Sequence, residues 1–136
     1  MKPKVLVVDD DIDYAQLIAY NLERQGCETF PVHNGVQALR VARAELPDVI
    51  LLDLMLPDLD GLSVCEILQA QPSTRGIPVL VVSALDESWA ETRKTKARAT
   101  RHFTKPVDLK VLAESVLAAC EERRAAVRAR MVEKEN

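Results

Sequence analysis

Cysteines are few in this sequence, and their arrangement argues against two common kinds of small domain. Only three occur among 136 residues, Cys27, Cys65 and Cys120, and none belongs to a CxxC pair. An odd number of widely separated cysteines disfavours a disulfide framework, and the missing CxxC disfavours a zinc ribbon. We therefore expect the cysteines to be small buried core residues in a reducing cytoplasm.

Long apolar runs and an excess of basic charge are also missing. The first apolar run, Val5–Val8, is too short for a signal-peptide core, and no run approaches the roughly 20 residues of a membrane span. Eighteen basic and 21 acidic residues give a net charge of −3, which does not indicate direct binding to nucleic acid. With 48% hydrophobic and 29% charged residues, the chain is expected to fold as one cytoplasmic domain.

Short apolar runs alternate with helical patterns five times along the chain. Continuous apolar strands between helices are typical of a parallel sheet that is covered on both faces. The pattern therefore predicts an α/β fold, a five-stranded doubly wound sheet of the flavodoxin type with strand order 2-1-3-4-5. The expected strands are 4–8, 27–32, 49–52, 79–82 and 102–104. The first helix is expected to begin at Asp11 or Asp13 and to stop at Gly26, and the second to begin at Asn34-Gly35 and to stop at Pro47. The third is expected to follow Asp60-Gly61 as far as Ala70, the fourth to span 87–97, and the last to follow Asp108.

The last helix changes character part of the way along. A stripe of apolar residues ends at Cys120, and the charged run Glu121–Arg124 interrupts it. Beyond this run, Val127 and Met131 stand alone among polar residues. We predict a domain at 1–122 and a polar helical extension at 123–136, either solvated or a partner-binding arm.

Polar side chains follow four of the five expected strands directly. Asp9, Asp10 and Asp11 follow the first strand, Asp53 the third, Ser83 the fourth and Lys105 the fifth. The carboxyl ends of parallel strands lie along one edge of the sheet, where ligands of such folds bind. Each residue alone could be an ordinary loop or helix-capping residue, but together they predict a site at this edge.

Clustered carboxylates repel each other unless cations neutralise them. Carboxylate oxygens favour Mg²⁺ or Mn²⁺, and no histidine or cysteine stands at these strand ends to favour zinc. A divalent cation, a lysine and a hydroxyl can together neutralise and hydrogen-bond a phosphoryl group. An aspartate can be the nucleophile that accepts this group as an aspartyl phosphate.

The motifs VLVVDDD, LLDLMLPDLDG, VLVVSA and FTKP resemble the signatures of the response-regulator receiver (CheY-like) family of two-component signalling, over roughly residues 3–120. The resemblance implies that Asp53 is the phosphoacceptor. It also implies that Asp10 and Asp53 bind Mg²⁺, Asp10 as a direct ligand. Asp9 is expected to bind the cation through water, and Met55 to lend its backbone carbonyl.

The resemblance also assigns the other two positions of the site. Ser83 matches the Ser or Thr that binds the phosphoryl group and moves on activation, and Lys105 matches the phosphate-binding lysine. The bond from Lys105 to Pro106 is often cis in this family. The implied partner is a histidine kinase or histidine phosphotransfer protein, and the chain is a stand-alone regulator or the N-terminal piece of a larger one. The implied chemistry is self-catalysed phosphotransfer and slow autodephosphorylation, without a separate substrate.

Two departures from the family pattern concern the output face. His102 stands where an aromatic residue is usual, and we expect it to be a surface or half-buried structural histidine. The segment before it is unusually basic, and either solvent or a docking partner could face it. The resemblance implies a possible homodimer through the fourth helix, fifth strand and last helix. The basic residues are Arg93, Lys94, Lys96, Arg98 and Arg101.

Three other functions fit the sequence less well. A haloacid-dehalogenase-like phosphohydrolase would use Asp9-Asp10-Asp11 but needs a cap and a late acidic pair. A degenerate receiver acting as a binding module conflicts with the complete set of site residues. A flavodoxin needs a Gly- or Ser/Thr-rich phosphate loop, which the sequence lacks. Within the receiver reading, Met55 and Leu85 flank the path of attacking water, and both are apolar, so hydrolysis is expected to be slow.

Overall fold

The computed structural model describes residues 1–84 and 101–135. It has the predicted parallel sheet, in the order β2-β1-β3-β4-β5, so the doubly wound fold is confirmed. The helix predicted at 87–97 lies outside the described residues. The strands are β1 (Lys4–Val8), β2 (Glu28–Val32), β3 (Val49–Leu52), β4 (Val79–Ser83) and β5 (Arg101–Thr104), and the described helices are α1 (Ile12–Arg24), α2 (Gly35–Glu45), α3 (Gly61–Ala70) and α5 (Leu109–Glu135).

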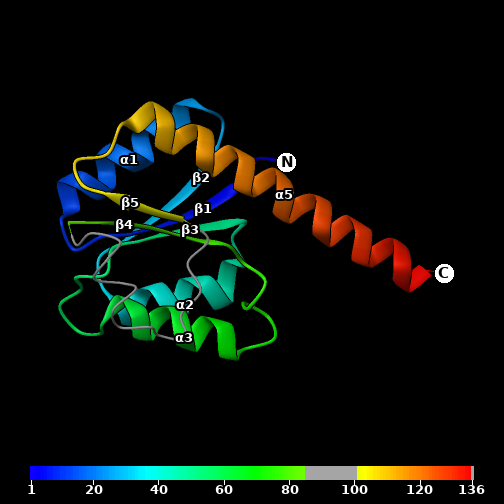
Figure 1. Cartoon of the computed structure of the whole chain (residues 1–136). Helices are drawn as coiled ribbons and strands as arrows, with labels where there is room; N and C mark the ends of the chain where they lie inside the picture. Colours follow the sequence, from blue (N-terminus) through cyan, green and yellow to red (C-terminus); the bar gives the residue numbers. More distant parts are fainter. Residues whose placement is uncertain (85–100, 136) are drawn as a thin grey trace.

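The sheet is the middle of three layers, with α1 and α5 on one face and α2 and α3 on the other (Figure 1). Successive strand residues point to opposite faces. In β1, Val5 and Val7 pack in the core beneath α1 and α5, whereas Leu6 and Val8 pack beneath α2 and α3. Because both faces are buried, the strands are continuous apolar runs, as the sequence indicated.

All three cysteines are free and buried, as expected. Cys27 and Cys120 belong to the core beneath α1 and α5, and Cys65 belongs to the core on the opposite face. Burial raises the pKa of the Cys65 and Cys120 thiols to about 12, so both stay protonated at neutral pH. They act as small apolar side chains in the packing.

Each described helix begins at a side-chain cap. The Asp11 carboxylate accepts a hydrogen bond from the amide of Tyr14 at 3.1 Å, and Asn34 accepts one from Gln37 at 2.9 Å. Asp60 caps α3 and Asp108 caps α5 in the same way. These caps satisfy amides that have no partner within the helix. Of the two predicted caps of α1, Asp11 is the one used.

The ends of the elements differ from the predictions by a residue or so. The amide of Cys27 donates to the carbonyl of Leu22, so Cys27 closes α1, and β2 begins at Glu28 instead. Gly26 permits this turn because its φ is +94°, which side-chain-bearing residues rarely adopt. At the end of α2, Leu46 takes the left-handed conformation just before Pro47.

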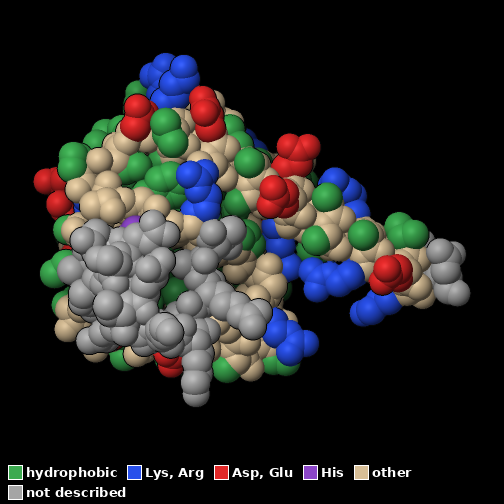
Figure 2. Space-filling model, in the orientation of Figure 1, with side chains coloured by type: hydrophobic (Ala, Val, Ile, Leu, Met, Phe, Trp, Pro, Cys, Tyr) green, Lys and Arg blue, Asp and Glu red, His purple; other side chains and the backbone are tan. Residues whose placement is uncertain are grey.

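The last helix, α5, runs without a break through the charged run that ends its apolar stripe. Its first half covers the sheet and buries Leu112 and Val116, whereas its second half projects away from the other elements (Figure 1). Basic side chains are prominent along the projecting part (Figure 2). The guanidinium of Arg124 donates to the carbonyls of Met1 and Lys2, both at 2.8 Å, so the start of the extension is attached to the domain. The boundary at 122 stays a prediction.

No described helix combines the length and the apolar character needed to cross a membrane.

Candidate functional site

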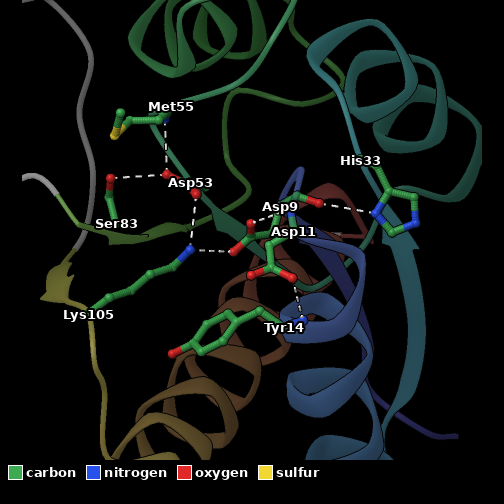
Figure 3. Close-up of polar contacts among 8 residues, drawn as sticks. All are labelled: Asp9, Asp11, Tyr14, His33, Asp53, Met55, Ser83 and Lys105. Carbon is green, nitrogen blue, oxygen red and sulfur yellow. Dashed lines mark hydrogen bonds and ion pairs between the residues drawn. The ribbon is translucent and has the colours of Figure 1, made fainter.

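Four predicted site residues meet at the carboxyl edge of the sheet (Figure 3). Asp9 follows β1, Asp53 follows β3, Ser83 ends β4 and Lys105 follows β5. Asp9 and Asp53 are 2% and 5% exposed and Ser83 is fully buried, so their polar atoms need partners within the protein. The parallel register brings them together, since every strand ends at the same edge.

Lys105 connects the two buried carboxylates. Its ammonium nitrogen lies 2.7 Å from Oδ2 of Asp9 and 3.1 Å from Oδ2 of Asp53. Burial by itself would lower the pKa of Lys105. Hydrogen bonds to the two carboxylates and attraction from their charges have a larger, opposite effect, so the pKa of Lys105 lies above its ordinary value. Lys105 therefore carries its charge at neutral pH.

The surroundings disfavour the charged form of Asp9, whereas they favour the charged form of Lys105. Burial raises the pKa of the Asp9 carboxyl, and repulsion from Asp53 adds to the rise. Hydrogen bonds from Lys105 and from the amide of Asp11 lower the pKa and only partly offset this effect. The negative charge on Asp9 is thus incompletely neutralised, and a further cation near it would be stabilised.

The second oxygen of Asp53 has its own partners. Its Oδ1 accepts hydrogen bonds from the Ser83 hydroxyl and from the backbone amide of Met55, both at 3.0 Å. Together with Lys105 on Oδ2, these bonds orient the carboxylate from both sides. The Met55 side chain is 54% exposed and takes no part in this network (Figure 3).

The loop after β3 is built around a close approach of two backbone segments. A Cβ atom on Gly61 would lie 2.5 Å from Cα of Leu54 and 2.8 Å from the carbonyl oxygen of Asp53, so only glycine fits. The amide of Gly61 donates to the carbonyl of Leu54. This contact holds the start of α3 against Leu54, the residue that follows the candidate acceptor Asp53.

Asp58 attaches the same loop to a second helix. Its carboxylate accepts hydrogen bonds from the amides of Gly35 and Val36 at 2.8 and 3.0 Å, in the first turn of α2. The bond from Gly35 is the main reason why the pKa of Asp58 lies below its ordinary value. The sequence pattern gives no sign of this role, since the bonded residues lie far from Asp58 in the chain.

Asp9, Asp10 and Asp53 form an acidic cluster that can hold a cation. One oxygen from each lies within 4.8 Å of the others. Asp9 and Asp53 are buried and Asp10 is exposed, so the cluster opens to solvent on one side. Its donors are all carboxylate oxygens, which suit a hard divalent cation. Asp11 caps α1 and is outside this cluster.

Two further side chains, His33 and Tyr14, contact residues of the site (Figure 3). The sequence had indicated neither contact. The Nδ1 atom of His33 is 3.0 Å from the backbone oxygen of Asp9. The ring of Tyr14 lies 4.6 Å from the ammonium of Lys105. Tyr14 also packs against the core beneath α1 and α5. Its place in the first turn after the acidic residues was the available signal.

The other predicted positions have mixed outcomes. The peptide bond between Lys105 and Pro106 is cis, as is common in the family that the motifs resemble. His102 is half-buried on β5, as expected. The metal-binding role of the Met55 carbonyl stays a prediction. Leu85 and the basic residues at 93–98 lie outside the described residues, whereas Arg101 is exposed on β5.

Comparisons with known proteins agree with this geometry. The sequence model of the response regulator receiver domain matches residues 5–117. The chain is 41% identical over 106 residues to the alkaline phosphatase synthesis transcriptional regulatory protein PhoP of Bacillus subtilis, covering 78% of this chain and 43% of that one. It is 38% identical over 108 residues to the response regulator PleD of Caulobacter vibrioides, covering 79% and 24%.

A solved structure, the receiver domain of the Francisella response regulator 1452, is 35% identical, with a TM-score of 0.80 over 89% of this chain and 98% of that one. The chain spans about a quarter to a half of the length of the curated relatives that it matches. The family match covers most of the domain and includes every strand end that contributes to the site. The chain belongs to the response regulator receiver domain family.

Proposed function

We propose that this receiver takes a phosphoryl group from a histidine kinase or a histidine phosphotransfer protein onto Asp53, with Mg²⁺ or Mn²⁺ as cofactor, in the cytoplasm. The observation that carries the proposal is the ammonium of Lys105 bound to both Asp9 and Asp53. Ser83 donates to the same carboxylate of Asp53. The site thus offers a nucleophile, a cation and a hydroxyl donor around one position.

In the proposed step, an Asp53 carboxylate oxygen bonds to the phosphorus of a phosphohistidine. The phosphorus–nitrogen bond of the donor breaks, and its electron pair stays on the imidazole, which takes up a proton. Lys105 and Ser83 then bind oxygens of the transferred group. The divalent cation would be held by Asp10, Asp53 and the Met55 carbonyl, with Asp9 through water, and would supply charge neutralisation.

The proposed consequence is a change at the face that includes β5 and α5. Ser83 and Thr104 are paired on neighbouring strands, and the amide of Lys105 donates to the carbonyl of Ser83 at 2.9 Å. A movement of Ser83 toward a phosphoryl group would therefore act directly on β5. We propose that this movement changes partner binding or self-association through that face and the helix expected at 87–97.

The test is phosphorylation with a small-molecule donor. The protein is incubated with acetyl phosphate and Mg²⁺, and its intact mass is measured. We expect the addition of one phosphoryl group to the parent and to Asp48→Asn, and none to Asp53→Asn. Asp48 is the matched control because it precedes β3, whereas Asp53 follows the same strand. Equal labelling of Asp53→Asn and the parent would overturn the assignment.

A further inference from the structure

The aromatic ring of Tyr14 contacts the lysine of the site. The centre of the ring is 4.6 Å from the ammonium nitrogen of Lys105, within the roughly 6 Å over which an aromatic face attracts a cation. The same nitrogen donates to Asp9 and Asp53. Three side chains, from α1 and from the ends of β1 and β3, therefore surround one ammonium (Figure 3).

The protein holds the Tyr14 ring in place. Tyr14 lies in the first turn of α1, where its amide donates to the capping carboxylate of Asp11 at 3.1 Å. Its side chain is half-buried and packs against the core beneath α1 and α5. The position of the ring is thus determined by the helix start and by the core.

We propose that Tyr14 is a positioning residue, whose ring holds the Lys105 ammonium between the carboxylates at the ends of β1 and β3. This proposal rests on the proposed phosphorylation of Asp53. A lysine has a flexible four-carbon stem, and an ammonium that is already in place costs less to order when the phosphoryl group arrives. The ring also covers part of the ammonium that water would otherwise solvate, which strengthens its attraction for a negative group.

A purely structural role for Tyr14 makes different predictions. If the ring only fills space in the core, leucine would replace it with little effect on phosphorylation. Tyr20 offers the matched control, since it lies on the same helix and its ring also faces a cation, Arg24, at 5.8 Å. Tyr20 is half exposed and has no contact with the site residues among its described interactions.

The first experiment compares initial rates of phosphorylation by acetyl phosphate at saturating Mg²⁺, read by intact mass. We expect Tyr14→Leu to lower the rate by about 2- to 30-fold, the range that corresponds to the loss of one cation–π contact. Tyr14→Phe keeps the aromatic face and should recover most of this loss. Tyr20→Leu should match the parent. A Tyr14→Leu rate equal to that of the parent would overturn the proposal.

The second experiment needs no phosphorylation. Urea midpoints are measured for the parent, Tyr14→Leu, Lys105→Met and the double variant, without donor. If the ring acts through Lys105, Tyr14→Leu should shift the midpoint less in the Lys105→Met background than in the parent. Equal shifts in both backgrounds would refute the contact. A parent that takes up no phosphoryl group would refute the proposed function, while this cycle would still decide the role of Tyr14.

Discussion

Removing the Lys105 ammonium should make the two buried carboxylates a source of instability. In Lys105→Met, Asp9 and Asp53 lose their shared cation while a side chain of similar length is kept. The side chains of Asp9 and Asp53 are 3% and 6% exposed, so water can replace the lost contacts only poorly. Each carboxylate would keep its other hydrogen bonds, but the two charges would repel each other across a poorly solvated space.

The size of the effect follows from the burial of the three groups. Removing one partner of a fully buried ion pair costs about 3–5 kcal/mol in unfolding free energy. The side chain of Lys105 is 20% exposed, and Asp9 is already incompletely neutralised in the parent. We therefore expect a loss near the lower limit, about 2–3 kcal/mol at pH 7.

The assay is urea unfolding followed by circular dichroism at pH 7 and at pH 4, with and without Mg²⁺. The difference between parent and variant should shrink at pH 4, since burial raises the pKa of Asp9 and a more protonated Asp9 repels its neighbour less. Mg²⁺ should raise the midpoint of the variant more than that of the parent, since the acidic cluster has lost its internal cation. Lys110→Met, an exposed lysine near the start of α5, is the control and should change the midpoint little.

Two results would refute this reasoning. If Lys105→Met is as stable as the parent at pH 7, the ion pairs contribute nothing net to the fold. If the variant is destabilised equally at pH 4 and pH 7, the cost comes from lost packing of the lysine stem and not from unpaired charge. In either case, the electrostatic account of the site would need revision.

Three further predictions concern the same edge of the sheet. Because burial raises the pKa of Asp9, the folded state binds more protons than the unfolded state above the ordinary value of 3.8, so stability should fall as pH rises through this window. Asp9→Asn should flatten the dependence in urea titrations across pH, and an unchanged slope would contradict the assignment. Gly61→Ala should destabilise the protein by about 2 kcal/mol and slow phosphorylation, since its Cβ would displace the backbone of Leu54 and Asp53; parent-like midpoints and rates would count against the close approach. Met55→Asn combined with Leu85→Glu should speed the decay of phosphorylated Asp53, since the family resemblance implies that both positions flank the attacking water and the new side chains are polar; equal decay rates, measured by intact mass, would refute this prediction.

The sequence alone determined the order of the described strands and helices and the edge of the sheet at which the site lies. The strands were predictable because helices cover both faces of the sheet. Residues that point to either face are therefore buried and apolar, as in Val5–Val8. The helix starts were predictable because caps such as Asn34 and Asp60 bond to amides two or three residues away. The convergence of Asp53 and Lys105 followed from the parallel order of the strands, which needs no knowledge of side-chain packing.

The individual bonds of the site required the tertiary structure. Three aspartates follow β1, and only the packed fold shows that Asp9 is buried beside Lys105 while Asp11 caps α1. The ring of Tyr14 reaches Lys105 because the start of α1 and the end of β5 both lie at the carboxyl edge of the sheet.

The same is true of contacts made by residues that local patterns left unassigned. Asp58 bonds to the start of α2, and Arg124 bonds to the N-terminal backbone across nearly the whole length of the chain. Local patterns report only on neighbouring residues, whereas these contacts depend on the distance and angle between whole elements. Those quantities are decided by how the side chains of the two cores pack, and for that reason only the folded chain shows them.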